Sequence, residues 1–309
     1  MVFFSIVIPV FNRANLIQIT IESILNQNID NYEIIIVDDG STDNTIEILQ
    51  EYGSKIKLFT QRNQGPGKAR NIGIEHSQGE YIAFLDSDDL WFPWTLDVYA
   101  QIIKATNNPA FLAGQSIFFS KSISFSNEHE LEFVQIPQLQ YRFYQNLYAS
   151  SKDVSSFLTS SVVIRRDTLQ QLGGFTDQWI NSEDNDLWLR LGTAEGFVYI
   201  DSPYVLAYRQ HSHSAISIAT KTYDGTRYLI QQEKQNQYPG GKIREKERLE
   251  ILTRHIRPVS LSCLHENEVH KGWQLYKETF LWHLVLGRFR YLIGFLWLIC
   301  VSIISYRRQ

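Results

Sequence analysis

The first part of the chain alternates between short apolar runs and segments whose apolar residues recur at helical spacing. Ile17, Ile21 and Ile24 lie about one helical turn apart and predict a helix between the first two apolar runs. The predicted strands cover residues 4–10, 32–37, 55–60 and 81–85, and the predicted helices start near residues 17, 45 and 69. Strands that alternate with helices predict an α/β fold with a doubly wound, mostly parallel sheet and helices on both faces.

The pattern is less regular after residue 110. Residues 110–155 mix Ser and aromatic residues without clear periodicity, and we expect a variable region that flanks a site. Gly173 and Gly174 predict a sharp turn, and Ser182 is a predicted helix cap followed by acidic residues. Further strands are predicted at residues 157–165, 197–200 and 204–209.

The composition indicates a globular protein. Hydrophobic residues make up 44% of the 309 residues and charged residues 20%, which suffices for a sizeable core. The apolar segment at residues 3–10 is short and contains Pro9, so it predicts a first strand rather than a signal peptide. Cys263 and Cys300 lack metal-site spacing and offer no disulfide framework, which fits reduced thiols in a cytoplasmic protein.

The charge is uneven along the chain. Residues 221–309 carry 15 Lys and Arg against 8 Asp and Glu, whereas residues 1–220 carry 14 against 25. This asymmetry predicts a first domain at residues 1–220 and a separate helical region at residues 221–309. The basic region contains no nucleic-acid-binding motif, so no nucleic acid partner is expected and an anionic membrane surface fits better.

The end of the basic region is apolar. Residues 291–306 contain no charge, and as a helix they would span about 24 Å, less than a bilayer core of about 30 Å. Arg288 and Arg290 precede this run, and Arg307 and Arg308 follow it, so the charges indicate no orientation. We expect a helix that lies in the inner face of the cell membrane, which makes the protein peripheral or monotopic there. A short spanning helix is the second interpretation, and a buried contact between subunits is the third.

The strongest chemical signal is an acidic cluster directly after the fourth predicted strand. Asp86, Asp88 and Asp89 lie within four positions, and carboxylates so close repel one another. A divalent cation relieves the repulsion, and Mg²⁺ takes one or two protein carboxylates and completes its shell with phosphate oxygens and water. The same residues are also typical of an acidic, solvated turn, and the cluster alone does not decide between the two.

Other polar and aromatic residues follow the ends of predicted strands. Phe11 follows the first strand, and Asp38 and Asp39 follow the second. Right-handed crossovers bring the carboxyl ends of parallel strands to one rim, where ligands bind in open α/β sheets. We therefore expect these residues and the acidic cluster to converge on one site.

Together these segments resemble the family 2 inverting glycosyltransferases, whose fold is called GT-A. The resemblance covers roughly residues 4–217 and depends on the order and spacing of seven motifs. The motifs are S-I-V-I-P-V-F-N from Ser5, V-D-D-G-S-T-D from Val37, G-K-A-R-N-I-G from Gly67, F-L-D-S-D-D from Phe84, G-G-F from Gly173, E-D-N-D-L-W-L-R-L from Glu183 and Y-R-Q-H from Tyr208. The resemblance implies a metal-dependent transfer, with Mn²⁺ or Mg²⁺, from a nucleoside-diphosphate sugar to a hydroxyl of a glycan or lipid-linked acceptor. The donor is expected to be a UDP-sugar, and the reaction a single displacement.

The resemblance also implies roles at the nucleotide. Pro9 and Phe11 belong to the nucleotide site, where Phe11 stacks on the base. Asp38 and Asp39 accept hydrogen bonds from base N–H groups and ribose hydroxyls, although both also suit an Asx-turn. Arg70 places a cationic fork beside the nucleotide.

The metal site is assigned in the same way. Asp88 is the expected direct ligand, and Asp86 binds the ribose or the metal through water. His211 fits the late histidine that completes the metal shell in some members, and His213 competes for that role. Asp89 is expected to start the following helix, where the helix dipole favours negative charge.

The resemblance assigns the catalytic base to Asp184, and its neighbour Glu183 is the alternative. A base must lie within hydrogen-bond reach of the acceptor hydroxyl. Judged from the residues alone, this acidic pair is equally typical of a helix N-terminus. Trp179 is expected to stack on an acceptor sugar, and a packed loop aromatic is the competing interpretation.

Other classes of function share some of these features. A non-catalytic module that binds a nucleotide sugar or a glycan would keep the loops without turning over a donor. A nucleotidyltransferase shares the fold class but uses a Gly-rich, Arg-containing N-terminal loop that this sequence does not show. A glycosidase also needs two carboxylic acids, but it would not need the nucleotide-like loops.

Overall fold

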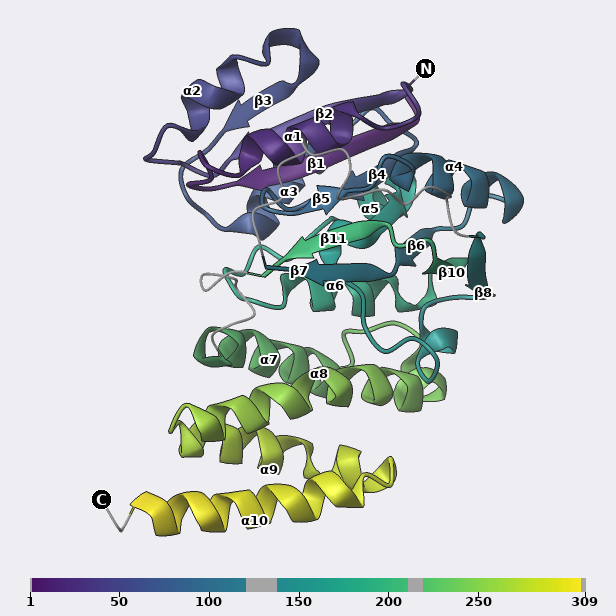
Figure 1. Ribbon diagram of the computed structural model, residues 1–309. Helices are drawn as coiled ribbons and strands as arrows, with labels where there is room; N and C mark the ends of the chain where they lie inside the picture. The colour runs from purple at the N-terminus through teal and green to yellow at the C-terminus, as the bar shows by residue number, and fades with distance from the viewer. Residues whose placement is uncertain (1, 121–137, 211–218, 307–309) are drawn as a thin grey trace. The chain divides into compact units, whose positions relative to one another are not determined.

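The computed structural model describes residues 2–120, 138–210 and 219–306. The chain forms two compact units (Figure 1). The first unit holds Met1–Leu147, Ser156–Trp179 and Ala194–His211, and the second holds Tyr148–Ser155, Ile180–Thr193 and Ser212–Gln309.

The first unit is built on an eight-stranded sheet. In the order in which they lie, the strands are β3 (Lys57–Thr60), β2 (Tyr32–Asp38), β1 (Phe4–Val10), β4 (Tyr81–Phe84), β9 (Val162–Arg165), β6 (Phe111–Gly114), β10 (Phe197–Ser202) and β8 (Gln140–Tyr144). β1 pairs in parallel with β2 and β4, β2 with β3, and β6 with β10. β9 runs antiparallel to both β4 and β6, and β8 runs antiparallel to β10. The prediction of a mostly parallel sheet is therefore confirmed, with antiparallel pairs at its centre and one edge.

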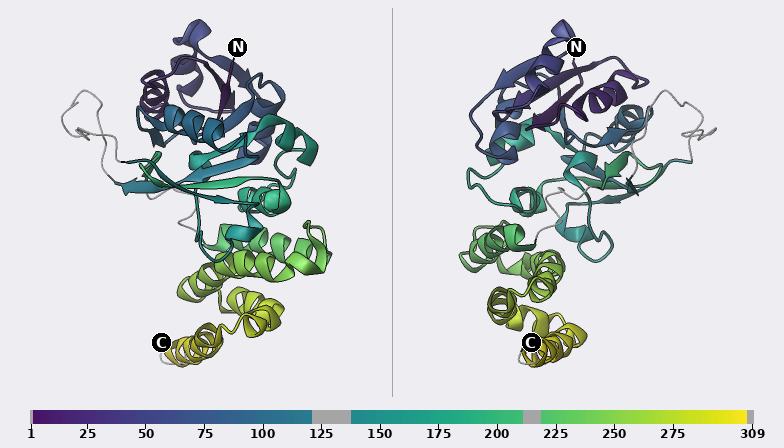
Figure 2. Two further views of the ribbon diagram at one scale, coloured as in Figure 1. Left: turned by 90° about the vertical axis from the view of Figure 1, so that its right-hand side faces the viewer. Right: turned by 60° about the vertical axis from the view of Figure 1, so that its left-hand side comes forward.

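Helices cover both faces of this sheet, because successive side chains of a strand point to opposite sides. The helices concerned are α1 (Ile17–Leu25), α3 (Pro66–Glu75) and α4 (Thr95–Ala105) (Figures 1 and 2). Ile34 and Ile36 of β2 belong to the apolar core shared with α1 and α4. Ile35 and Val37, one position along, pack instead with Ala69 of α3. This alternation confirms the doubly wound arrangement.

A second, three-stranded sheet fixes the chain after the acidic cluster. Its strands lie in the order β5 (Leu90–Trp91), β11 (Leu206–Arg209) and β7 (Ser116–Phe119). β5 begins directly after Asp89, and the buried indole of Trp91 donates to the Ser160 carbonyl at 2.8 Å. The acidic cluster therefore connects two sheets of the first unit.

The strand predicted at residues 157–165 is shorter than expected. Thr159–Ser161 form a 3-10 turn, and only Val162–Arg165 join the sheet as β9. The hydroxyl of Ser161 donates to the Leu158 carbonyl at 2.8 Å, and such side-chain bonds to a nearby backbone group compete with strand pairing. The remaining short elements of the first unit are α2 (Thr45–Gln50), α5 (Arg166–Leu172) and a 3-10 turn at Gly53–Lys55.

The second unit is helical. It comprises α6 (Glu183–Arg190), α7 (Ala219–Lys234), α8 (Glu245–His265), α9 (Val269–Val285) and α10 (Phe289–Tyr306), with 3-10 turns at Tyr148–Ser150, Leu191–Thr193 and Gly241–Arg244. Leu189 of α6 is buried with Ile230 of α7 and Ile256 of α8, and the Tyr148 hydroxyl donates to the Leu189 carbonyl at 2.6 Å. None of the helices in the described part of the chain is both long enough and apolar enough to cross a membrane.

Candidate active site

The acidic cluster after β4 is surrounded by arginines of the first unit. Arg13, in the loop after β1, lies 3.2 Å from Asp88, and Arg70 of α3 lies 2.6 Å from Asp86. The Arg209 guanidinium of β11 donates to the Asp88 carbonyl at 2.9 Å. These cations offset part of the repulsion among the carboxylates, so the protein itself supplies some of the positive charge that we expected from a metal alone.

Asp89 is the buried member of the cluster. Its carboxylate accepts from the Ser160 hydroxyl at 2.6 Å and from the Arg209 backbone N–H at 3.0 Å. Burial, followed by the charges of Asp86 and Asp88, raises the pKa of Asp89 well above its ordinary value. The expectation that Asp89 starts a helix is wrong, because the strand β5 follows it. Asp89 joins the cluster to β11 instead.

The loops after β1 and β2 are bonded to each other. Asn12 has a positive φ of 52°, and its backbone N–H donates to the Ser41 hydroxyl at 2.9 Å. Its side-chain oxygen accepts from the Thr42 N–H at 2.8 Å. The ends of these two strands therefore form one rim, as the sequence predicts.

Asp38 forms the Asx-turn that the sequence left open as an alternative. One carboxylate oxygen, Oδ2, accepts from the backbone N–H groups of Gly40 and Ser41 at 3.1 and 3.0 Å. The other oxygen, Oδ1, is buried and has no hydrogen-bond partner within the part of the chain that the structure describes. It is an acceptor that the N–H or hydroxyl of a ligand would satisfy.

Asp39 organises the loop that leads into α3. It accepts from the side chain of Gln61 at 2.6 Å and from the backbone N–H groups of Gln64 and Gly65 at 2.8 and 2.9 Å. A carboxylate has about four acceptor positions, so roughly one remains for a ligand. Trp179 lies against this loop, since a Cβ added to Gly65 would be 3.1 Å from the indole Cδ1. The Trp179 side chain is 70% exposed, which leaves most of its surface open to a ligand.

Arg70 is held in place by the G-G-F turn. Its guanidinium lies over the ring of Phe175, 5.2 Å from the centroid. Asn71 fixes Phe175 through two hydrogen bonds of 2.8 and 2.9 Å to its backbone N–H and carbonyl. Gly174 has a positive φ of 72°, and a Cβ there would meet Asn71 at 2.4 Å. Gly174 therefore permits the close approach of Asn71, which holds Phe175 beside Arg70.

Phe11 and Pro9 lie near the end of β1. Phe11 is partly exposed just beyond the strand, which suits an aromatic platform for a base. Pro9 is buried within the strand, opposite Val37 of β2.

The predicted base lies in the second unit, at the start of α6. Asp184 accepts hydrogen bonds from the backbone and side chain of Asn185 at 2.7 and 2.9 Å. Ser182 occupies the N-cap position but makes no side-chain cap bond, and its hydroxyl instead lies 3.1 Å from Nε2 of His255 on α8. Burial lowers the pKa of His255, while the Asp184 charge acts in the opposite direction. Glu183 and Asp184 are both half-buried.

Several contacts around the predicted residues were missed from sequence. Arg209 belongs to the Y-R-Q-H motif, so a signal was present, and Arg13 directly follows the first motif. Ser160 carried no signal, because its hydroxyl matters only once the 3-10 turn places it beside Asp89.

A cation at this site would be held mainly by carboxylates. Among residues 2–120, 138–210 and 219–306, no group of three or more His, Cys, Asp or Glu side chains is arranged to hold a metal. His211 and His213 lie outside the described residues. The carboxylates of Asp86 and Asp88, two positions apart in the loop after β4, nevertheless fit Mg²⁺ or Mn²⁺ that completes its shell with diphosphate oxygens.

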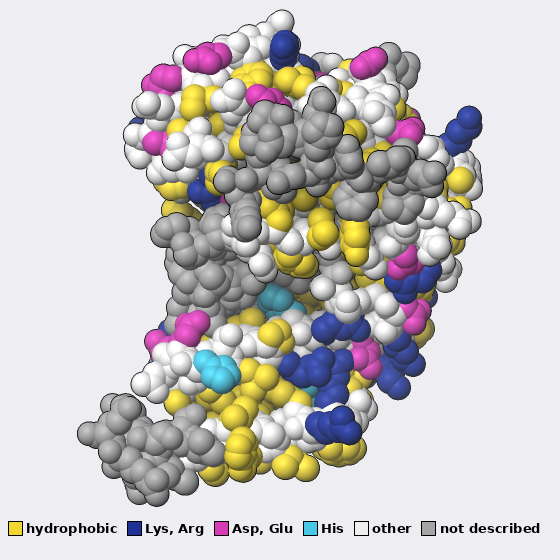
Figure 3. All heavy atoms as spheres, viewed as in Figure 1, with side chains coloured by type: hydrophobic (Ala, Val, Ile, Leu, Met, Phe, Trp, Pro, Cys, Tyr) yellow, Lys and Arg dark blue, Asp and Glu magenta, His cyan; other side chains and the backbone are white. Residues whose placement is uncertain are grey.

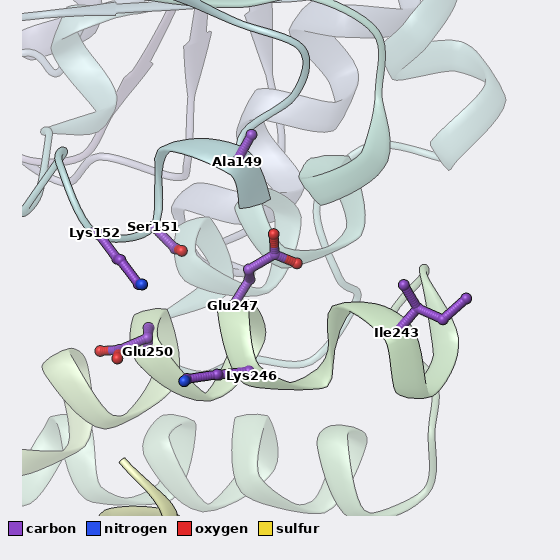
Figure 4. A pocket seen from close by; sticks show the side chains of 7 residues that line it. All are labelled: Ala149, Ser151, Lys152, Ile243, Lys246, Glu247 and Glu250. Atoms are coloured by element: carbon purple, nitrogen blue, oxygen red, sulfur yellow. The ribbon is translucent and has the colours of Figure 1, made fainter. Parts of the chain in front are cut away.

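A pocket of about 390 Å³ in the second unit involves none of the predicted site residues. It is lined by Ala149, Ser151, Lys152, Ile243, Lys246, Glu247 and Glu250 (Figure 4). Its charged side chains are of both signs, so it offers no clear preference for an anionic donor.

Comparison with known proteins places these features in a family. Residues 5–173 match glycosyl transferase family 2. The UDP-Glc:α-D-GlcNAc-diphosphoundecaprenol β-1,3-glucosyltransferase WfgD of Escherichia coli is 29% identical over 215 residues, which cover 69% of this chain and 79% of WfgD. The chain spans only 15% and 66% of the lengths of two Rickettsia relatives described as uncharacterized glycosyltransferases.

Two solved structures share the fold. Residues 1–349 of S. aureus TarS in complex with UDP-GlcNAc superpose with a TM-score of 0.70 at 18% identity, covering 99% of this chain and 92% of that one. The mannosyltransferase PcManGT of Pyrobaculum calidifontis, in complex with GDP-Man and Mn²⁺, gives a TM-score of 0.53 at 17% identity, covering 97% and 86%. Since the family match covers more than half of the chain and includes the loops after β1, β2 and β4, the chain belongs to glycosyl transferase family 2 and has the GT-A fold.

Proposed function

We propose that this protein transfers a sugar from a UDP-sugar to a hydroxyl of a lipid-linked glycan, with inversion, at the inner face of the cell membrane. The relative WfgD is named for a UDP-Glc donor and a diphosphoundecaprenol-linked acceptor, and the TarS structure contains UDP-GlcNAc. Both names support the donor and acceptor classes without fixing the sugar.

The observation that carries the proposal is the meeting of three loops at one rim of the sheet. The loops after β1 and β2 are joined through Asn12, and the loop after β4 is joined to the first through Arg13 and Asp88. Each loop brings acceptor or donor groups of the kind that a nucleoside diphosphate needs. A binding site for a base, a ribose and two phosphates accounts for all of them.

The donor would be held by residues of the first unit. Phe11 stacks on the base, while the unpartnered Asp38 Oδ1 and the remaining acceptor position of Asp39 take donor hydrogens of the base and ribose. Arg70, already paired with Asp86, adds positive charge beside the phosphates. Pro9 shapes this end of β1.

Asp86 and Asp88 would hold Mg²⁺ or Mn²⁺ together with the diphosphate, and His211 is a further candidate ligand. When bound, such a cation neutralises charge on the departing diphosphate. The PcManGT structure, which contains Mn²⁺, supports a divalent cation in this fold.

Asp184 would act as the base. It takes the proton of the acceptor hydroxyl, the hydroxyl oxygen bonds to the anomeric carbon, and the bond from that carbon to the diphosphate oxygen breaks, so that UDP leaves. Glu183 is the alternative base. Trp179, exposed beside the Asp39 loop, offers an aromatic face to a sugar ring.

The test compares UDP release by wild type, Asp184→Asn and Glu183→Gln in the presence of lipid-linked acceptor extract. General-base catalysis is worth roughly 10²–10⁴-fold, so Asp184→Asn is expected to lose about that factor while Glu183→Gln retains activity. Stabilisation of the fold by UDP and Mn²⁺ should persist in Asp184→Asn, because the donor binds to the other unit. If all three proteins bind the donor and none turns it over, the chain is a binding module.

The metal assignment has its own measurement. Ligand at 100 times its dissociation constant stabilises a fold by about 2.7 kcal/mol, and Asp88→Asn should lose most of the part of that stabilisation that depends on Mn²⁺. An undiminished thermal shift in Asp88→Asn contradicts the role of Asp88.

A further inference from the structure

The second unit contains a basic pocket that the transfer reaction does not use. It has a volume of about 430 Å³ and is lined by Arg257, Gly287, Arg288, Phe289, Arg290 and Tyr291. Arg257 comes from α8, and the other residues form the turn into α10 and its first helical turn. We call it the arginine pocket.

Positive charge in the arginine pocket is only partly balanced. Arg288 forms an ion pair with Glu250 through Nη2, but its Nη1 is buried and has no hydrogen-bond partner among the described residues. Burial and then the nearby charge of Arg288 lower the pKa of Arg257 and of Arg254. One glutamate therefore faces several guanidinium groups that repel one another.

A neighbouring histidine adds no further positive charge. His283 of α9 is fully buried, its ring lies 4.3 Å from that of Tyr291, and neither ring nitrogen has a partner in the described part of the chain. Burial, together with Arg288 and Arg257, lowers the pKa of His283 to about 3, so it is neutral at physiological pH.

The start of α10 adds a second attraction for an anion. The first backbone N–H groups of a helix have no acceptor within the helix, and the helix dipole places partial positive charge there. Phe289, Arg290 and Tyr291, which line the pocket, are the first three residues of this 18-residue helix. The Tyr291 N–H already donates to the Arg288 carbonyl at 3.1 Å, so the N–H groups of Phe289 and Arg290 are the candidates for an anion. A phosphate group fits this combination of guanidinium and N–H donors.

Apolar side chains continue from the pocket along α10. Phe289, Ile293 and Trp297 recur every four residues and are 56%, 70% and 65% exposed. The opposite side of the helix is covered, because Leu292 and Phe295 pack against Leu264 and Tyr276. Figure 3 shows Lys and Arg side chains beside hydrophobic ones on this part of the second unit.

A positively charged site that continues into an exposed apolar stripe matches a phospholipid, which carries a phosphate next to its acyl chains. A soluble phosphate would account for the arginines but not for the stripe. A second copy of the chain would account for the stripe but would bring its own arginines against these.

We propose that the arginine pocket binds the phosphate group of an anionic membrane lipid while Phe289, Ile293 and Trp297 enter the lipid interface. This inference rests on the membrane location given under the proposed function and names the residues that provide it. It is independent of the chemistry at Asp184.

The test is cosedimentation of the full-length protein with vesicles of phosphatidylcholine, alone or mixed with phosphatidylglycerol. Each basic residue near an anionic surface is worth about 1 kcal/mol, so Arg257→Gln and Arg290→Gln should each lower the partition coefficient about fivefold. Arg290 is exposed, so its replacement spares the fold, and Arg290→Lys should retain binding. Lys242→Gln, which removes one exposed positive charge elsewhere in this unit, is the matched control and should change binding less than twofold.

Several results would overturn the inference. Equal losses in Lys242→Gln and Arg290→Gln would mean a diffuse charge effect without a phosphate site. If the wild type does not bind anionic vesicles, but inorganic phosphate raises its thermal stability and not that of Arg290→Gln, the ligand is a soluble phosphate. Wild type that binds no vesicles and forms dimers that Trp297→Ser separates would mean a protein contact. UDP release is measured on the same samples, so a failed lipid site is distinguished from a failed transferase.

Discussion

Replacing Asp39 by asparagine tests whether this carboxylate mainly stabilises the loop that leads into α3 or mainly binds the donor. Its two oxygens accept three hydrogen bonds from Gln61, Gln64 and Gly65, and its side chain is nearly fully buried. Asparagine keeps one oxygen, which can hold Gln61 and Gln64, but its NH₂ group then faces the N–H of Gly65. Two donors cannot bond to each other.

The expected cost follows from that one lost interaction. A hydrogen bond to a charged group contributes about 1.5–3 kcal/mol, and leaving a buried donor unsatisfied costs about 1–3 kcal/mol. Both energies refer to the loss of the same Gly65 N–H bond, so they are not added. We therefore expect Asp39→Asn to lower the free energy of unfolding of the first unit by about 2 kcal/mol. Turning the amide over does not help, because its NH₂ group would then face Gln61 and Gln64.

Urea denaturation followed by circular dichroism measures the loss, and calorimetric titration with UDP measures donor binding. Asp30→Asn, at an exposed position in the loop before β2, is a matched control that should change stability by less than about 0.5 kcal/mol. If Asp39→Asn unfolds like the control while UDP affinity collapses, the carboxylate serves the ligand alone and the structural argument is refuted.

Two further predictions concern Gly225 and Asp89. A Cβ on Gly225 of α7 would lie 1.5 Å from the Asn181 carbonyl oxygen, so Gly225→Ala should displace the start of α6. We expect this variant to lose about 1–3 kcal/mol of stability and to release UDP more slowly. Gly294→Ala in α10 meets nothing within 4 Å and should leave UDP release unchanged; equal rates in the two variants would contradict the prediction. Because the pKa of Asp89 is raised in the fold, the unfolded chain loses that proton first, and the stability contributed by protonated Asp89 decreases as pH rises from about 4 through the raised value. Asp89→Asn should therefore flatten the pH dependence of the urea midpoint, and parallel curves for wild type and variant would exclude this role.

The apolar periodicity was sufficient to predict the sheet around β1, β2 and β4, because those strands are buried on both faces and read as continuous apolar runs. It could not show that β9 runs antiparallel between β4 and β6, because a continuous apolar run has the same pattern in a parallel and in an antiparallel strand. The convergence of Asp38 and Asp39 with the acidic cluster followed from chain order alone. The arginines that hold the cluster did not, because Arg209 reaches Asp88 only through the pairing of β5 with β11.

The arrangement of the second unit limits where this chain can be truncated. The segment that contains Tyr148 and the helix that carries Asp184 share their apolar core with α7 and α8. Cutting the chain after residue 218 would therefore uncover Leu189 and the Tyr148 ring and remove the packing of α7 and α8 against the helix that carries the proposed base. If Asp184 is the base, the C-terminal helices support the helix that positions it, and a truncated protein that still bound UDP would be expected to lose transfer even when acceptor is supplied in detergent.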